Sequence, residues 1–193
     1  IAQIAACYLL GLYLAQLRGN KYVDEVATYL DELGRMPDRI SQVLTSEEEV
    51  RDLARSMADV TSVLFLGRHV GFPVALEGAL KLKELAYIHA EGFAAGELKH
   101  GPIALIEEGL PVFFIVPTPR RPVLHDKVIS NIQEIRARGA RTIVIAEEGD
   151  VDVEPFADHI IRVPATPTIL WPLLTVVPLQ VFAAALAGAK GLD

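Results

Sequence analysis

The chain has 193 residues, of which 51% are hydrophobic and 22% charged, so it can bury the core of one globular domain. Its formal net charge of −7 argues against nucleic acid or an anionic membrane surface as a partner, because phosphates attract basic surfaces. The single cysteine, Cys7, excludes an internal disulfide framework and favours a reducing, cytoplasmic location. We expect Cys7 to be a small buried hydrophobe.

The first 58 residues are predicted to be a helical segment that leads into an α/β domain of residues 59–193. An apolar helix covers residues 1–17, and a second helix runs to Gly34 with apolar residues at helical spacing. The chain begins with Ile1 inside a helical pattern, and no basic segment precedes the apolar run, so a signal peptide is not expected. We expect instead a piece of a longer protein.

Beyond residue 59, short apolar runs alternate with helical patterns. Buried strands are predicted at residues 63–66, 111–117, 141–146 and 159–163. One helix is predicted at residues 74–88, with residues 87–91 as its end and Gly92 as its stop, and another at residues 123–138. This alternation predicts an α/β fold, a doubly wound parallel sheet flanked by helices on both faces.

Residues 169–189 form the one segment with the length of a membrane span, because these 21 residues carry no formal charge. The segment contains Pro172, Pro178 and Gln180, and no clear basic flank lies on either side. A buried helix or a dimer helix is therefore the preferred interpretation, and no membrane partner is expected.

The predicted helix after the strand at 63–66 carries the main chemical signal. A strand, a glycine turn and a helix place the helix N-terminus at the carboxyl end of the strand, where open sheets bind ligands. Glu77, Lys81 and Glu84 share one face of this helix, so the Lys81 ammonium can hold the Glu84 carboxylate and tune its pKa. His100 follows in a constrained loop. Taken alone, these patterns also fit a solvated Glu–Lys stripe and a solvated loop histidine.

Other motif classes are absent. The sequence has no glycine-rich phosphate loop, no Cys/His cluster with metal-ligand spacing and no nucleophile elbow, so neither a cofactor nor a metal is expected. Arg120 and Arg121 fit a phosphate clamp, but a proline-rich surface turn is the preferred interpretation. His125 and His159 are isolated and receive no role. What remains is acid–base chemistry, as in the isomerisation of a sugar.

Residues 75–112, ALEGALKLKELAYIHAEGFAAGELKHGPIALIEEGLPV, closely resemble the second sugar-isomerase (SIS) domain of the glutamine–fructose-6-phosphate aminotransferases, also called glucosamine-6-phosphate synthases. The similarity is dense over residues 64–112 and looser elsewhere, including ARGA near residue 137 and VPLQ near residue 177. The resemblance implies a SIS-type, flavodoxin-like sheet. It also implies an enzyme that converts fructose 6-phosphate and glutamine-derived ammonia to glucosamine 6-phosphate.

The resemblance further implies roles for three residues. Glu84 would carry the proton between C1 and C2 of the sugar, Lys81 would be its charged neighbour, and His100 would open the sugar ring. In such enzymes the loop that matches residues 96–102 contributes to the adjoining subunit's site, so a homodimer is implied. His89 lies inside the same motif and is treated as supporting.

The resemblance also implies parts that lie outside these 193 residues: a glutaminase domain, a first SIS domain with the phosphate-binding loop, and a C-terminal tail lysine. The isolated chain is therefore expected to be inactive, although it belongs to an active enzyme. Two alternatives stay open. One is a non-catalytic, regulatory sugar-phosphate-binding SIS domain, and the other is a dimerisation module with residues 1–17 and 169–189 as its surfaces.

Overall fold

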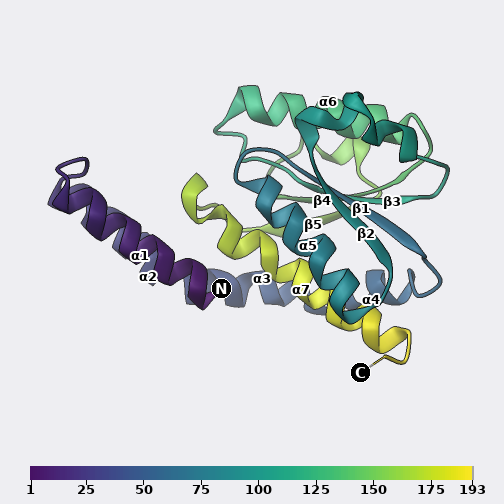
Figure 1. The fold of residues 1–193 in the computed structure, drawn as a ribbon, viewed down its shortest axis with the longest axis horizontal. Coiled ribbons are helices and arrows are strands. Elements are labelled where there is room, and N and C mark those ends of the chain that lie inside the picture. The colour runs from purple at the N-terminus through teal and green to yellow at the C-terminus, as the bar shows by residue number, and fades with distance from the viewer. Residues whose placement is uncertain (193) are drawn as a thin grey trace.

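A five-stranded parallel sheet forms the centre of the computed structural model, which describes residues 1–192 (Figure 1). The strands are β1 (Ser62–Gly67), β2 (His89–Ala94), β3 (Pro111–Ile115), β4 (Arg141–Glu147) and β5 (His159–Val163). Their order is β2-β1-β3-β4-β5, and all four neighbouring pairs are parallel. This is the strand order of flavodoxin-like sheets, so the predicted doubly wound α/β fold is confirmed.

Helices cover both faces of the sheet, as predicted (Figure 1). One face carries α5 (Gly71–Leu85) and α7 (Trp171–Ala189), and α3 (Met36–Val43) and α4 (Glu47–Arg55) pack against α7. The other face carries α6 (Pro122–Arg136) and the short 3-10 helices η2 (Ala95–His100) and η3 (Pro102–Leu105). Because alternate side chains of a strand point to opposite faces, each strand contributes to two separate apolar cores.

Three aromatic rings occupy the centre of the larger core. The ring of Phe65 on β1 stacks on that of Phe113 on β3, with centroids 5.0 Å apart and planes 15° apart. Phe182 on α7 meets Phe113 edge to face at 4.9 Å. These contacts lock α7 onto the middle of the sheet. Met36 and Met57 are also buried in this core, so the helices before β1 extend it.

α7 is a core helix of this structure. Residues Thr168–Ala189 have a mean hydropathy of 2.0 and would be long and apolar enough, by length and composition, to cross a membrane. However, 67% of the tested window is buried inside the protein. The prediction of a buried helix at residues 169–189 is confirmed.

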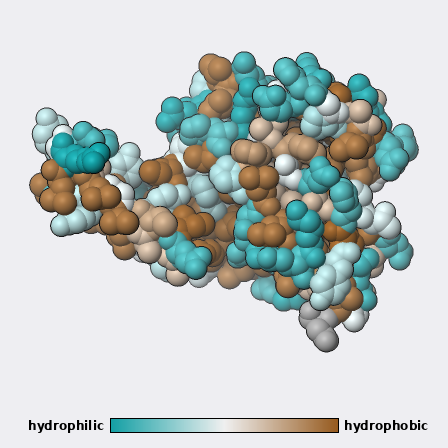
Figure 2. Space-filling model, in the orientation of Figure 1, coloured by the Kyte–Doolittle hydropathy of each residue, from teal (hydrophilic) through white to brown (hydrophobic). Residues whose placement is uncertain are grey.

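The helices α1 (Ala2–Leu17) and α2 (Val23–Gly34) form a hairpin that projects away from the sheet (Figure 1). No residue of α1 is buried against the part of the chain that the structure describes. The prediction that Cys7 is buried is wrong: its thiol is free and exposed, because α1 lacks a covering layer there. Hydrophobic side chains are consequently gathered on the surface of the projecting hairpin (Figure 2).

Strand β2 is the one sheet element that the sequence interpretation misses. The predicted helix at 74–88 is too long, because α5 ends at Leu85 and Tyr87 adopts a left-handed conformation with φ of 51°. Residues His89–Ala94 then pair with β1 along the edge of the sheet. Gly92 is not a helix stop: a Cβ there would lie 2.9 Å from the backbone of α5, so glycine lets β2 pass close to that helix.

Candidate functional site

The candidate site lies on α5, whose start is fixed by a tight turn after β1. A Cβ at Gly67 would lie 2.1 Å from the carbonyl oxygen of Gly71, so only glycine fits there. Pro73 lies in the first helical turn, where its missing N–H is tolerated. The buried face of α5 is lined by small and aliphatic residues that pack on the sheet and α7: Val74, Ala75, Gly78, Ala79 and Leu82.

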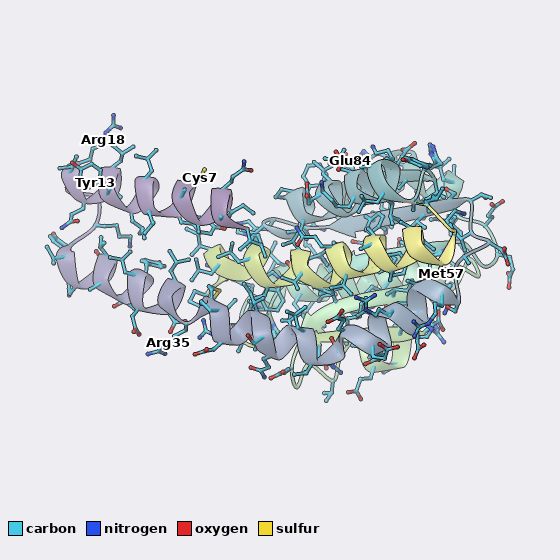
Figure 3. The ribbon with its side chains drawn as sticks, turned by 90° about the horizontal axis from the view of Figure 1, so that it is seen from below. Cys7, Tyr13, Arg18, Arg35, Met57 and Glu84 are labelled. Atoms are coloured by element: carbon cyan, nitrogen blue, oxygen red, sulfur yellow. The ribbon has the colours of Figure 1, made fainter. Side chains whose placement is uncertain are left out.

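The opposite face of α5 carries the predicted charged group. The Lys81 Nζ atom lies 2.6 Å from Oε2 of Glu84 and 3.6 Å from Oε1 of Glu77. The hydrogen bond to Glu84 raises the pKa of Lys81, which therefore stays positively charged. The Lys81 and Glu84 side chains are 26% and 49% exposed, so this anchored carboxylate is open to a ligand. Figure 3 shows Glu84 on the outer side of its helix.

Exposed apolar side chains flank this pair. Leu76, Leu80 and Tyr87 all belong to the large hydrophobic residues that remain exposed. An anchored ammonium–carboxylate pair beside apolar side chains is suited to acid–base chemistry once another surface excludes water. The geometry therefore describes one wall of a site.

The strand–turn–helix pattern favours a site at the carboxyl ends of the strands, but the Lys81–Glu84 pair lies at the opposite end of the sheet. The N-terminus of α5 does lie at the carboxyl edge of β1, but Lys81 and Glu84 occupy its last turns. α5 runs back across the sheet before β2 begins, so the pair lies near the amino ends of the strands.

His100 is consequently separated from the Lys81–Glu84 pair within one chain. His89 is at the start of β2 and His100 follows its end, and six residues of β2 at roughly 3.3 Å each span about 20 Å. His100 is exposed in η2, with Nδ1 3.8 Å from Oε2 of Glu97. His89 is exposed and its Nε2 lies 3.0 Å from Oε1 of Glu91. The structure thus brings Lys81 and Glu84 together but not His100.

The two loop arginines behave as the preferred interpretation expects. The guanidinium of Arg120 forms a two-point ion pair with the buried carboxylate of Glu147 and donates to the carbonyl oxygen of Thr166 at 3.0 Å. Arg120 is therefore occupied by a structural contact. Arg121 is exposed at the start of α6.

A buried histidine–aspartate pair is the polar cluster that sequence reasoning misses. Nε2 of His125 lies 2.8 Å from Oδ2 of Asp150, and both side chains are buried. Asp152 completes three groups whose ligand atoms lie within 4.8 Å of one another, which is the donor set of a possible cation site. Both Asp150 oxygens already accept hydrogen bonds, from His125 and from the Asp152 N–H, so the cluster links α6 to the β4–β5 turn. His125 is 25 residues from Asp150 in sequence, so the pair gives no local signal.

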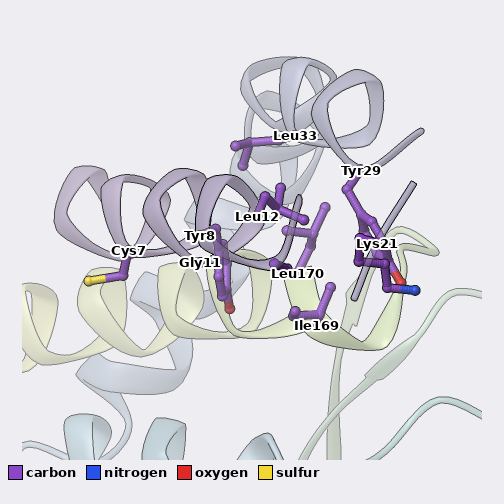
Figure 4. Close-up of a pocket in the computed structure, with 10 residues that line it drawn as sticks. Cys7, Tyr8, Gly11, Leu12, Lys21, Tyr29, Leu33, Ile169 and Leu170 are labelled. Carbon is purple, nitrogen blue, oxygen red and sulfur yellow. The ribbon is translucent and has the colours of Figure 1, made fainter. Parts of the chain in front are cut away.

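An apolar cavity of about 330 Å³ lies between the α1–α2 hairpin and the residues before α7 (Figure 4). Leu12, Leu33 and Leu170 are among its lining residues, and Lys21 is its one charged member. Lys21 is paired with Glu25 at 2.7 Å. The lining is mainly apolar, so the cavity is suited to packing against another apolar surface.

Comparisons with known proteins agree on one family. A family model described as the SIS domain matches residues 56–189. The chain is 70% identical over 192 residues to a glutamine–fructose-6-phosphate aminotransferase (isomerizing) of Corynebacterium glutamicum, and 67% identical to that of Streptomyces coelicolor. Each alignment covers 99% of this chain and 31% of the relative, so the chain spans less than a third of these proteins' length.

Solved structures give the same result. The C-terminal domain of glucosamine-fructose-6-phosphate aminotransferase from Francisella tularensis matches with a TM-score of 0.88 and 33% identity, over 96% of this chain and 52% of that one. Tagatose-6-phosphate ketose/aldose isomerase from Escherichia coli matches with a TM-score of 0.71 at 23% identity, over 88% and 46% of the two chains, which supports the fold alone. The chain therefore belongs to the SIS domain family.

Proposed function

We propose that this chain provides the isomerase half of a glutamine–fructose-6-phosphate aminotransferase, which converts fructose 6-phosphate and glutamine-derived ammonia to glucosamine 6-phosphate. The observation that carries the proposal is the Lys81–Glu84 pair on the open face of α5, with 2.6 Å between Nζ and Oε2. This pair occurs in a chain that is 70% identical, over 99% of its length, to the relative of that name from C. glutamicum.

In this proposal Glu84 is the proton carrier. Converting a ketose to an aldose requires a base that takes a proton from C1 and returns it to C2 through an enediol or enolamine. The Glu84 carboxylate can do this because it is exposed and held in place by the Lys81 ammonium group. Lys81 holds the carboxylate in position, and Glu77 supports Lys81 from the preceding helical turn.

His100 is proposed to open the sugar ring in the partner subunit's site. The length of β2 separates His100 from Glu84 of the same chain, whereas both side chains are exposed. A homodimer in which the two sites exchange their η2 segments would bring the groups together. This arrangement accounts for the distance between Glu84 and His100 within one chain, because each site takes the two residues from different subunits.

The remaining parts of the site are proposed to come from the longer protein. We propose that residues 1–58 link a preceding SIS domain to the domain of residues 59–193, and that the exposed apolar side chains of α1 contact that preceding domain. The support is the uncovered surface of α1 and the cavity beside it. A cytoplasmic location is proposed because Cys7 is a free thiol.

The test is conversion of fructose 6-phosphate to glucose 6-phosphate by the full-length protein that contains this chain. Glu84→Gln should lower kcat by about 10²- to 10⁴-fold without a comparable change in KM, because the amide cannot accept the proton. Lys83→Gln, on the same helix, is the matched control and should retain activity.

A full-length protein that binds fructose 6-phosphate but never isomerises it would refute the catalytic proposal. That result would favour the regulatory sugar-phosphate-binding alternative. Equal activity of Glu84→Gln and Lys83→Gln would remove Glu84 from the mechanism.

A further inference from the structure

A small basic hollow lies at the carboxyl edge of the sheet, on the face that α6 covers. Its volume is about 190 Å³. Its polar lining consists of Arg68, Lys99, Lys127, Ser130, Asn131 and Glu134. Within one chain, neither Lys81 nor Glu84 belongs to the hollow, because both lie near the amino ends of the strands.

Three segments that are distant in sequence build the hollow. Arg68 directly follows β1, Lys99 belongs to η2 after β2, and Lys127 and Ser130 lie on α6. β1 and β2 are parallel neighbours, so their carboxyl ends lie side by side. Open parallel sheets characteristically bind ligands at this edge.

The hollow carries an excess of positive charge although the chain carries a net charge of −7. It contains three basic side chains and one carboxylate, and that carboxylate is used by Lys99, whose Nζ lies 2.8 Å from Oε1 of Glu134. Within residues 1–192, Arg68 and Lys127 form no side-chain hydrogen bond or ion pair. Arg68 is moreover half-buried. A partly desolvated guanidinium without a counter-charge is unfavourable, and a bound anion would compensate it.

The position of Arg68 is held by its own backbone. The neighbouring His69 adopts φ of 56°, a conformation that is uncommon for residues other than glycine. The carbonyl oxygen of Arg68 accepts a hydrogen bond from the Gly71 N–H at 3.0 Å. A Cβ at Gly96 would lie 3.3 Å from Nη2 of Arg68, so glycine gives the guanidinium room beside η2. The turn thus fixes the backbone position from which the Arg68 side chain extends.

Asn131 fixes the two walls relative to each other. With its amide nitrogen turned toward η2, this buried side chain donates hydrogen bonds to the carbonyl oxygens of Ala95 at 3.1 Å and Lys127 at 2.9 Å. It therefore ties α6 to η2 directly beside the unpaired cations. A site whose walls are held in advance loses less conformational freedom when a ligand binds.

We propose that this hollow binds the phosphate group of a phosphorylated small molecule, with Arg68 and Lys127 as its main ligands. The planar guanidinium fork matches phosphate oxygens, and the ammonium adds a point charge from the opposite wall. The volume suits a phosphate group with its ester oxygen. This site is additional to the proposed isomerising site, although Gly96 and Lys99 share η2 with His100, which is proposed to enter the partner subunit's site.

The test is a calorimetric titration of the full-length protein with inorganic phosphate, at constant ionic strength set with sodium chloride. We expect one class of phosphate site to weaken about tenfold or more in Arg68→Gln and several-fold in Lys127→Gln. Gly96→Ala should also weaken it slightly although no charge changes, because the new methyl group shifts the guanidinium by a few tenths of an ångström. Arg138→Gln removes an exposed arginine beyond the far end of α6 and should leave phosphate binding unchanged.

Two results would overturn the proposal: phosphate affinity that is the same in all four variants and the unchanged protein, or a loss in Arg138→Gln equal to that in Arg68→Gln. The second result would mean that only the overall charge matters. If Arg68→Gln does not fold, Lys127→Gln and Gly96→Ala decide the question. A parallel titration with fructose 6-phosphate distinguishes a phosphate ester from the free anion, because the true ligand is the tighter binder at the Arg68-dependent site.

Discussion

Gly78 allows α5 to pack closely between the sheet and α7, and replacing it with alanine tests this packing. A Cβ at Gly78 would lie 2.9 Å from Cδ1 of Leu179 and from Cδ1 and Cε1 of Phe65. Phe65 cannot move easily, because its ring is 1% exposed and stacks on Phe113. Overpacking of a core costs about 1 to 3 kcal/mol. Alanine gains about 1 kcal/mol over glycine in helix propensity, so the steric term is the larger one.

We therefore expect Gly78→Ala to lower the free energy of unfolding by about 1 kcal/mol, which in urea is a midpoint shift of about 0.5 M. The matched control is Gly11→Ala in α1, where no atom lies within 4 Å of the new Cβ. This control contains only the propensity term and should be neutral or stabilising. A gain in stability for Gly78→Ala that equals the gain for Gly11→Ala would refute the packing argument.

Two further predictions concern the pH dependence of stability and the arrangement of the subunits. The pKa of His159 is lowered below its ordinary value of 6.5, mainly because the side chain is partly buried and secondly because the positive charge of Arg141 is near. The folded state therefore binds this proton more weakly than the unfolded state, so stability is complete above about pH 6.5 and falls as the pH drops through the folded pKa. Thermal unfolding at about pH 7.5 and 5.5 should show this loss, and a His159→Asn protein with an undiminished loss would contradict it. The second prediction concerns a mixture of full-length Glu84→Gln and His100→Asn proteins. Subunit exchange should restore about a quarter of the activity of the unchanged protein, because half of the random dimers carry one complete shared site. No recovery after subunit exchange would place both groups in one subunit.

Four of the five strands were predictable because each contains a short apolar run. Residues 63–66, 111–117, 141–146 and 159–163 each contain or overlap an observed strand, and each is buried on at least one face. Such runs are typical of parallel sheets with helices on both faces. The edge strand β2 has no such run, and its sequence HAEGFA contains no β-branched residue. Its pairing depends on the turn at Tyr87 and on the close approach at Gly92, which are tertiary features.

The candidate site was predictable only in its local part. The spacing of Lys81 and Glu84 predicts their contact, because helix geometry fixes which side chains are neighbours. The direction of α5 had to be known before the pair could be placed at the amino ends of the strands. The presence of β2 had to be known before His100 could be placed far from the pair. The catalytic roles of Glu84, Lys81 and His100 stay predictions. The hollow around Arg68 and Lys127 joins three segments and has no linear signature.

The position of α7 at the end of the chain affects how this domain folds during synthesis. α5 ends at Leu85 and α7 begins at Trp171, yet the two pack together on the same face of the sheet. Contacts between segments so distant in sequence form slowly, because a long loop must close first. During synthesis, a growing chain can contain all five strands while the face around Phe65 and Phe113 is still uncovered by α7. Completion of this domain therefore waits for α7 to leave the ribosome, and until then the nascent chain needs protection from aggregation.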